Sequence, residues 1–155
     1  IDMKKDNSNN TSLNYNKNEE EIAQKYVISL GYEINYKYGE IDNYTFTKNN
    51  MYGSLDSYYY STIWGVQNVK PENYFDKQII TYGFNVKNHP LQKIYNSDTN
   101  IYIMICENKV IGGYSFPNGD FAGSVYSVNG STLEEVAGMS YDEWEDRWKE
   151  LYKNF

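Results

Sequence analysis

The hydrophobic positions near the N-terminus follow a helical spacing. Apolar residues recur from Ile22 to Leu30, and this spacing predicts one apolar stripe along a helix. The glutamates at 19–21 precede the stripe and suit a first turn, because negative charge there interacts favourably with the helix dipole. We therefore expect a helix that begins near Asn18 and stops at Gly31.

Alternating apolar and polar positions predict strands in the next part of the chain. Residues 32–38 alternate until Gly39 and Glu40 interrupt them, and residues 44–47 form a second short candidate strand. Gln78–Lys87 is the clearest strand, because every second side chain is apolar and shares one face: Ile80, Tyr82, Phe84 and Val86. The segment 55–64 fits either element, and Asp56 and Ser57 as a first turn favour a helix that ends at Gly65.

The segment Asn100–Phe116 predicts a hairpin of two strands. Residues 101–106 are apolar on both faces, which indicates a strand that is covered on both sides and central in its sheet. Asn108–Lys109 makes the turn, since Asn tolerates the left-handed backbone of tight hairpins. Gly112–Gly113 then indicates a bulge or a close backbone approach.

The C-terminal part predicts one more strand and a helix. A third strand of the meander is expected over Phe121–Val128, between turns at Pro117–Asp120 and Asn129–Gly130. The helix begins with Ser140-Tyr141-Asp142-Glu143, which has the pattern of a capping box. Its aromatic stripe is expected to pack on the sheet or on the first helix, and consists of Trp144, Trp148, Leu151 and Tyr152.

Together these elements predict an α+β fold. We expect a mostly antiparallel sheet of about five strands, ending in a C-terminal meander, packed with an N-terminal and a C-terminal helix. The length of 155 residues suits one domain. Residues 1–17 are polar and carry no period, so we expect a flexible polar tether over 1–17 and a single α+β domain over 18–155.

The composition is tyrosine-rich and acidic. The chain has 18 Tyr, 3 Trp and a net charge of −7. An acidic surface repels phosphate backbones, so nucleic acid is set aside as a partner. Since no apolar run approaches the length of a spanning helix, we expect contact with a membrane only through a lipid anchor upstream of Ile1.

The residues that usually carry catalysis are almost absent. The single Cys106 lies among apolar strand residues, and the single His89 lies before Pro90 at a strand end. We expect an inert thiol, with a Cys–His pair as the alternative. No spacing suggests a metal site or a cofactor, although the adjacent Glu134 and Glu135 have the chemistry of an acid–base pair.

The candidate binding residues are the aromatic side chains Tyr58, Tyr59, Tyr60 and Trp64. Exposed aromatic rings in a row stack on sugars or peptides. Half-buried packing is the alternative in such a tyrosine-rich chain.

Three motifs carry a resemblance to a known family: Tyr82-x-Phe84-x-Val86 with Asn88-His89-Pro90, the run Ile101 to Gly113, and Ser140 to Trp144. Over roughly Glu20–Phe155 they resemble a domain of unknown function from small secreted lipoproteins of low-GC Gram-positive bacteria. The resemblance implies an extracellular protein, tethered to the outer face of the cell membrane through a lipidated cysteine upstream of Ile1. It carries over no activity, cofactor or catalytic residue.

We therefore expect a monomeric, non-catalytic module of the cell envelope that binds an unknown peptide, glycan or protein. The first alternative is a small acidic inhibitor or immunity-type protein that masks a basic surface, which the net charge of −7 suggests. The second alternative is a hydrolase that uses a carboxylate pair.

Overall fold

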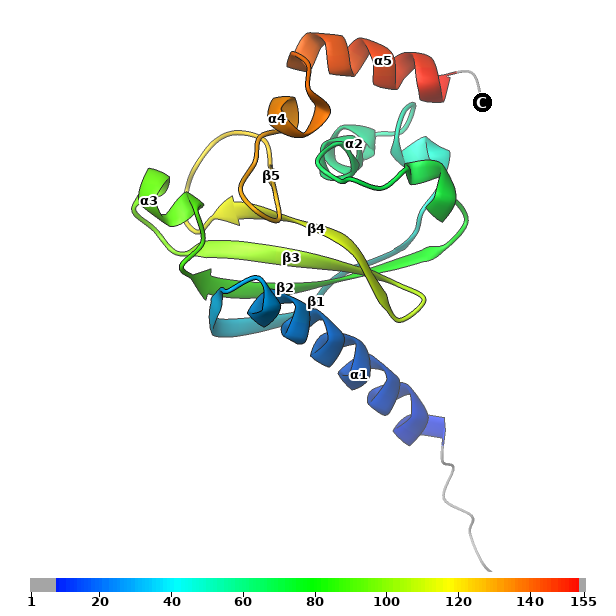
Figure 1. The fold of residues 1–155 in the computed structure, drawn as a ribbon. Coiled ribbons are helices and arrows are strands. Elements are labelled where there is room, and N and C mark those ends of the chain that lie inside the picture. Colours follow the sequence, from blue (N-terminus) through cyan, green and yellow to red (C-terminus); the bar gives the residue numbers. More distant parts are fainter. Residues whose placement is uncertain (1–7, 154–155) are drawn as a thin grey trace, which may run out of the picture.

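The computed structural model describes residues 8–153, with side chains from residue 18 onward, and contains one five-stranded antiparallel sheet (Figure 1). The strand order is β1-β2-β3-β4-β5, so each strand pairs with the next one along the chain. This meander with helices before and after it confirms the predicted α+β fold. The strands are β1 (Glu33–Thr45), β2 (Gln78–Lys87), β3 (Thr99–Cys106), β4 (Lys109–Pro117) and β5 (Tyr126–Ser127).

Helices cover both faces of the sheet. α1 (Ser8–Ser29) lies across one face, and α2 (Ser57–Gly65), α4 (Leu133–Ala137) and α5 (Tyr141–Lys153) lie on the opposite side (Figure 1). The short helix α3 (Leu91–Tyr95) connects β2 to β3. Two single turns complete the fold, at Lys48–Asn50 and Pro71–Tyr74.

Two hydrophobic cores result, one on each face of the sheet. Ile80 and its alternate neighbours on β2 pack with Ala23 and Val27 of α1. The opposite face contributes Ile79 and Met104 to a second core, which contains the side chains of α2 and α5. β3 is the middle strand and is apolar on both faces because both faces are covered, as the sequence predicted.

α1 begins earlier than the sequence predicted. The expected start near Asn18 is wrong, because the helix already includes Ser8, and residues 8–17 of the predicted tether are helical. Residues 1–7 of that tether lie outside the described part of the chain. The first turns of α1 extend beyond the sheet (Figure 1), so they need no apolar stripe and leave no periodic signal in the sequence. Packing on the sheet includes Glu19, a buried carboxylate that accepts a hydrogen bond of 3.0 Å from the Tyr82 hydroxyl.

β1 is one strand where the sequence predicted two. Glu33–Thr45 pairs continuously with β2, and three register shifts absorb its extra length. Gly39 lies in one of these bulges with a φ of +78°, which glycine adopts without strain. The interruption at Gly39 is therefore a bulge within the strand and does not end it.

Two details of the meander also differ from the prediction. The β3–β4 turn consists of Glu107 and Asn108, both with positive φ, because Lys109 already pairs with Cys106. The third strand, expected over Phe121–Val128, is reduced to Tyr126–Ser127. Phe121 and the three residues after it are exposed and make no strand pair. The alternating pattern alone therefore predicted too long a strand.

The helical predictions for α2 and α5 are confirmed. The Ser140 hydroxyl accepts from the Glu143 amide at 3.2 Å, as an N-cap does. Trp144 and Tyr152 are buried and Trp148 is half-buried, but Leu151 is exposed. The aromatic stripe joins the core that contains α2, which lies on the other side of the sheet from α1. The short helices α3 and α4 were not predicted.

Candidate binding site

The outer edge of β4 has a strand along only part of its length. β5 pairs with Tyr114 and Ser115 alone. Among the described residues, no strand pairs with the outer side of Lys109–Gly113, which we call the free edge segment. The fifth position of the sheet is therefore occupied at one end and open at the other.

The side chain of Gln67 closes one end of the free edge segment. Its Oε1 accepts from the Gly113 amide at 2.9 Å, and its Nε2 donates to the Gly113 carbonyl at 2.6 Å. Nε2 also donates to the Ile63 carbonyl at 2.9 Å, which fixes the side chain to α2. One side-chain amide thus makes both bonds that a residue of a neighbouring strand would make.

The two glycines of β4 allow two close approaches, Gly112 to the Gln67 side chain and Gly113 to the backbone of β3. A Cβ on Gly112 would lie 2.1 Å from Gln67 Oε1, and a Cβ on Gly113 would lie 2.4 Å from the Tyr102 carbonyl. A register shift also lies here, opposite Met104 and Ile105. Both predictions for Gly112–Gly113, a bulge and a close approach, are confirmed.

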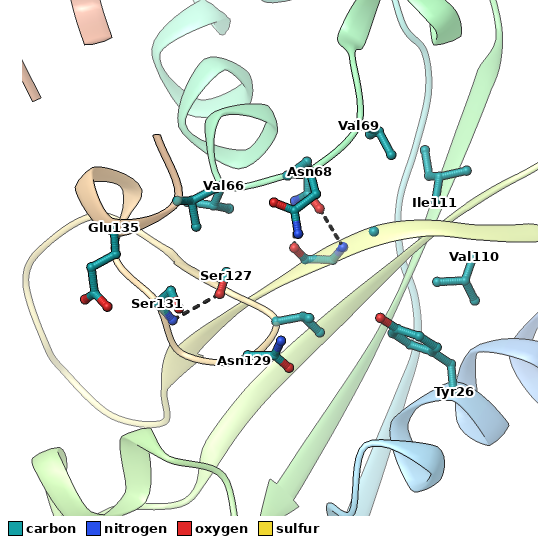
Figure 2. A pocket seen from close by; sticks show the side chains of 15 residues that line it. Tyr26, Val66, Asn68, Val69, Val110, Ile111, Ser127, Asn129, Ser131 and Glu135 are labelled. Carbon is teal, nitrogen blue, oxygen red and sulfur yellow. Dashed lines mark hydrogen bonds between the residues drawn. The ribbon is translucent and has the colours of Figure 1, made fainter. Parts of the chain in front are cut away.

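A pocket of about 680 Å³ lies along the free edge segment (Figure 2). Its walls come from three separate regions of the chain: the end of α1, the loop after α2, and the region from the turn after β5 to α4. We call this space the edge pocket, and it is lined by Tyr26, Val66, Gln67, Asn68, Val69, Val110, Ile111, Gly112, Gly113, Ser127, Val128, Asn129, Ser131, Glu135 and Val136.

The lining of the edge pocket combines apolar groups with neutral polar groups. Valine and isoleucine side chains supply apolar surface, while Asn68 and Asn129 supply amides. Among the described residues that line the pocket, Glu135 has the only acidic or basic side chain. Its Oε1 completes the capping box of α4 by accepting from the Thr132 amide at 3.4 Å, and it also accepts from the Thr132 hydroxyl at 3.2 Å. Such a lining favours a neutral or cationic ligand that offers both hydrogen bonds and apolar groups.

The wall formed by the turn after β5 is held by its own hydrogen bonds. The Ser115 hydroxyl donates to the Ser127 carbonyl at 2.7 Å, and the Ser127 hydroxyl accepts from the Ser131 amide at 3.0 Å. Figure 2 shows Ser127 and Ser131 joined across this turn, with Asn129 beside them. These bonds fix the shape of the wall before any ligand binds.

The structure does not place the four predicted aromatic residues on one surface. Consecutive helical residues point about 100° apart, so the α2 tyrosines diverge. Tyr58 is exposed and lines a small pocket with Tyr141 and Trp148. The Tyr59 hydroxyl lies 3.3 Å from that of Tyr114.

Tyr60 and Trp64 serve mainly in packing. The Tyr60 hydroxyl donates to Asp42 Oδ2 at 3.1 Å. Trp64 is 1% exposed and stacks on Phe46 with ring centroids 4.0 Å apart. Its Nε1 donates to the Tyr44 hydroxyl at 3.1 Å, so the indole has its partners inside the core and offers no surface to a ligand.

The single histidine and the single cysteine lie at opposite ends of the sheet. His89 follows β2 beyond Val86, whereas Cys106 lies beyond Ile105, which pairs with Ile80. From Ile80 to Val86 the strand spans about 20 Å. Burial raises the pKa of the Cys106 thiol, with a further contribution from Glu107. The structure therefore does not bring the two side chains together.

His89 is held in a neutral form by its contacts. Its Nδ1 accepts from the Leu91 amide at 3.1 Å, so its Nε2 carries the hydrogen and donates to the Val128 carbonyl at 2.9 Å. Burial lowers the pKa of His89, and the bond to Val128 offsets part of that effect. This arrangement links the loop after β2 to the wall of the edge pocket.

The two adjacent glutamates, Glu134 and Glu135, do not face a common pocket. Glu135 lines the edge pocket, whereas the neighbouring Glu134 lines a separate small pocket beside Tyr126. Within the described residues, no three His, Cys, Asp or Glu side chains gather closely enough to hold a metal ion. In the same part of the chain, no helix has both the length and the apolar character to cross a bilayer.

Sequence reasoning did not identify Gln67 or the edge pocket. The pocket exists because β5 pairs with only part of β4, whereas the sequence predicted a longer strand in place of β5. The available signal was Gly112–Gly113, which indicated a close approach without naming its partner. Comparison with protein-family models, curated proteins and solved structures finds no match to this chain.

Proposed function

We propose that this domain is a non-catalytic binding module of the cell envelope, and that the edge pocket holds its ligand. The observation that carries the proposal is the open fifth position of the sheet beside a pocket of about 680 Å³. A pocket of this size fits a short peptide or an oligosaccharide.

The lining supports binding rather than a reaction. The amides and hydroxyls of the edge pocket are neutral groups, and its single carboxylate, Glu135, serves as a helix cap. Neutral donors and acceptors orient a ligand without moving a proton. The valines beside them bury the apolar part of a ligand.

A matched pair of variants tests the proposal. Val69 and Val125 are both half-buried and pack against the same core, but only Val69 lines the edge pocket. We expect Val69→Lys to abolish capture of ligands from a glycan array and from a displayed library of random decapeptides, because its ammonium group enters the pocket. Val125→Lys should preserve capture. If no glycan or peptide binds in a Val69-dependent way, the proposed function is wrong.

The envelope location rests on the resemblance of the motifs and has its own test. We propose that the natural protein is attached to the outer face of the membrane through a lipidated cysteine upstream of Ile1. Membrane fractions should retain the protein, and substitution of that cysteine should release it. A gene without an export signal upstream of Ile1 would contradict this location.

A further inference from the structure

The two edges of the sheet differ in their protection against an added strand. β1, at one edge, has three register shifts and exposed charges at Glu33, Lys37 and Glu40. Bulges and charges of this kind prevent another strand from pairing. The free edge segment of β4 has one register shift, and Lys109 is its only charged residue. Only the β4 edge is thus left suited to pairing.

Gln67 already shows the kind of partner that the β4 edge accepts. A side-chain amide has the same donor and acceptor as a peptide group. The amide of Gln67 bonds both backbone groups of Gly113, at 2.9 and 2.6 Å. It occupies the place of one strand residue, and among the described residues no strand pairs with the outer side of Lys109–Gly112. Val110, Ile111 and Gly112 of this stretch line the edge pocket.

The walls of the edge pocket fit the side chains of an extended chain. In a strand, successive side chains point to opposite faces of the sheet. On one face they would meet Val69 and the loop after α2, and on the other Tyr26 of α1 (Figure 2). The lone carboxylate of Glu135 and the net charge of −7 favour a ligand with a basic residue.

We infer that the ligand is an extended, basic or neutral peptide that completes the fifth strand of the sheet along Lys109–Gly112. About five residues would pair, and Gln67 would mark the end of the pairing. The inference rests on the proposed function and specifies its ligand. A glycan has no regular series of backbone amides and would not pair in this way.

The experiment blocks backbone pairing in peptides selected from the random decapeptide library. The tightest peptide is synthesised with a single N-methyl group at each position in turn, and each version is titrated against the full chain. In a strand pair, alternate residues direct their amides to the partner. We expect alternate N-methyl groups to weaken binding by at least about tenfold and the intervening ones to have little effect.

Hydrogen exchange locates the pairing. The unmodified peptide should slow exchange within residues 109–113, in the wild type and in Val125→Lys alike. Selection of acidic peptides, N-methyl effects without alternation, or protection centred elsewhere would overturn the inference and leave the binding function standing. Binding of glycans alone would also overturn it.

A second copy of this chain is the competing occupant of the β4 edge. Sedimentation without peptide decides between the two occupants. We expect a monomer, whereas concentration-dependent dimers that protect residues 109–113 would overturn the inference. If the chain captures neither glycan nor peptide, the proposed function itself fails, and this outcome differs from all of those above.

Discussion

At the scale of single residues, Trp64 and Tyr58 show why one aromatic run has two roles. Trp64 is 1% exposed and Tyr58 is 68% exposed, although both belong to α2. The helix turns the first into the core and the second toward solvent. A ring that is buried with its polar atom bonded contributes to stability.

Substitution of these two residues separates the roles. Trp64→Ala should lower the free energy of unfolding by about 3–5 kcal/mol, because it leaves a large cavity beside Phe46. Tyr58→Ala should change it by less than about 0.5 kcal/mol. Urea denaturation measures both values. An unchanged stability in Trp64→Ala would contradict the assignment of this residue to the core.

His89 makes stability depend on pH. Burial lowers the pKa of His89 in the folded chain from the ordinary value of 6.5. Below about pH 6.5 the unfolded chain therefore binds a proton more readily than the folded chain, and stability falls as the pH falls through this range. Protonation of Nδ1 would also remove the bond from the Leu91 amide.

A glutamine at this position removes the titration and keeps a donor for Val128. We expect acidification from pH 7.5 to 5.5 to lower the urea midpoint of the wild type more than that of His89→Gln. The corresponding difference in the free energy of unfolding should stay below about 1.4 kcal/mol per pH unit, which is the limit for one proton. Equal changes in the two proteins would show that His89 does not contribute.

At the scale of the elements, the two adjacent glycines of β4 pack against different neighbours. A Cβ at Gly113 would meet the backbone of β3, which cannot move without breaking strand pairs. A Cβ at Gly112 would meet only the side-chain end of Gln67. The two positions are therefore adjacent but have different tolerance.

This difference predicts the outcome of two alanine substitutions. Gly113→Ala should lower the free energy of unfolding by about 1–3 kcal/mol, as overpacking against a fixed backbone does. Gly112→Ala should cost less, about 1 kcal/mol, and should release the Gln67 amide from Gly113. Thermal unfolding gives the order, and faster hydrogen exchange at Gly113 identifies the released amide. The reverse order of stability would contradict the proposed contacts.

The sequence predicted most elements because most of them have a buried face. Val27 of α1 and Phe84 of β2 lie in cores, so their spacing carried the signal. The elements that it missed give no repeated spacing: the first turns of α1 extend beyond the sheet, and α3 and α4 have five residues each, with one buried leucine apiece. The edge pocket was missed because pairing between distant segments decides it, and hydrophobic spacing within one segment does not record such pairing.

At the scale of the whole molecule, the two edges of the sheet differ in how open they are to an added strand. β1 is bulged and charged, whereas β4 has an open segment that is surrounded by three separate regions of the chain. Tyr26 belongs to α1, so the helix that follows the N-terminal segment also forms a wall of the edge pocket. The N-terminal helix therefore contributes a side chain to the proposed ligand site.

The most direct test of the edge pocket as the ligand site is an amide NMR titration of the full chain with its selected ligand. The measurement does not depend on whether that ligand is a peptide or a glycan. The account predicts shifts concentrated in residues 66–69, 109–113 and 127–131. Shifts centred on Tyr58, Tyr59 and Tyr141, with none along β4, would contradict it.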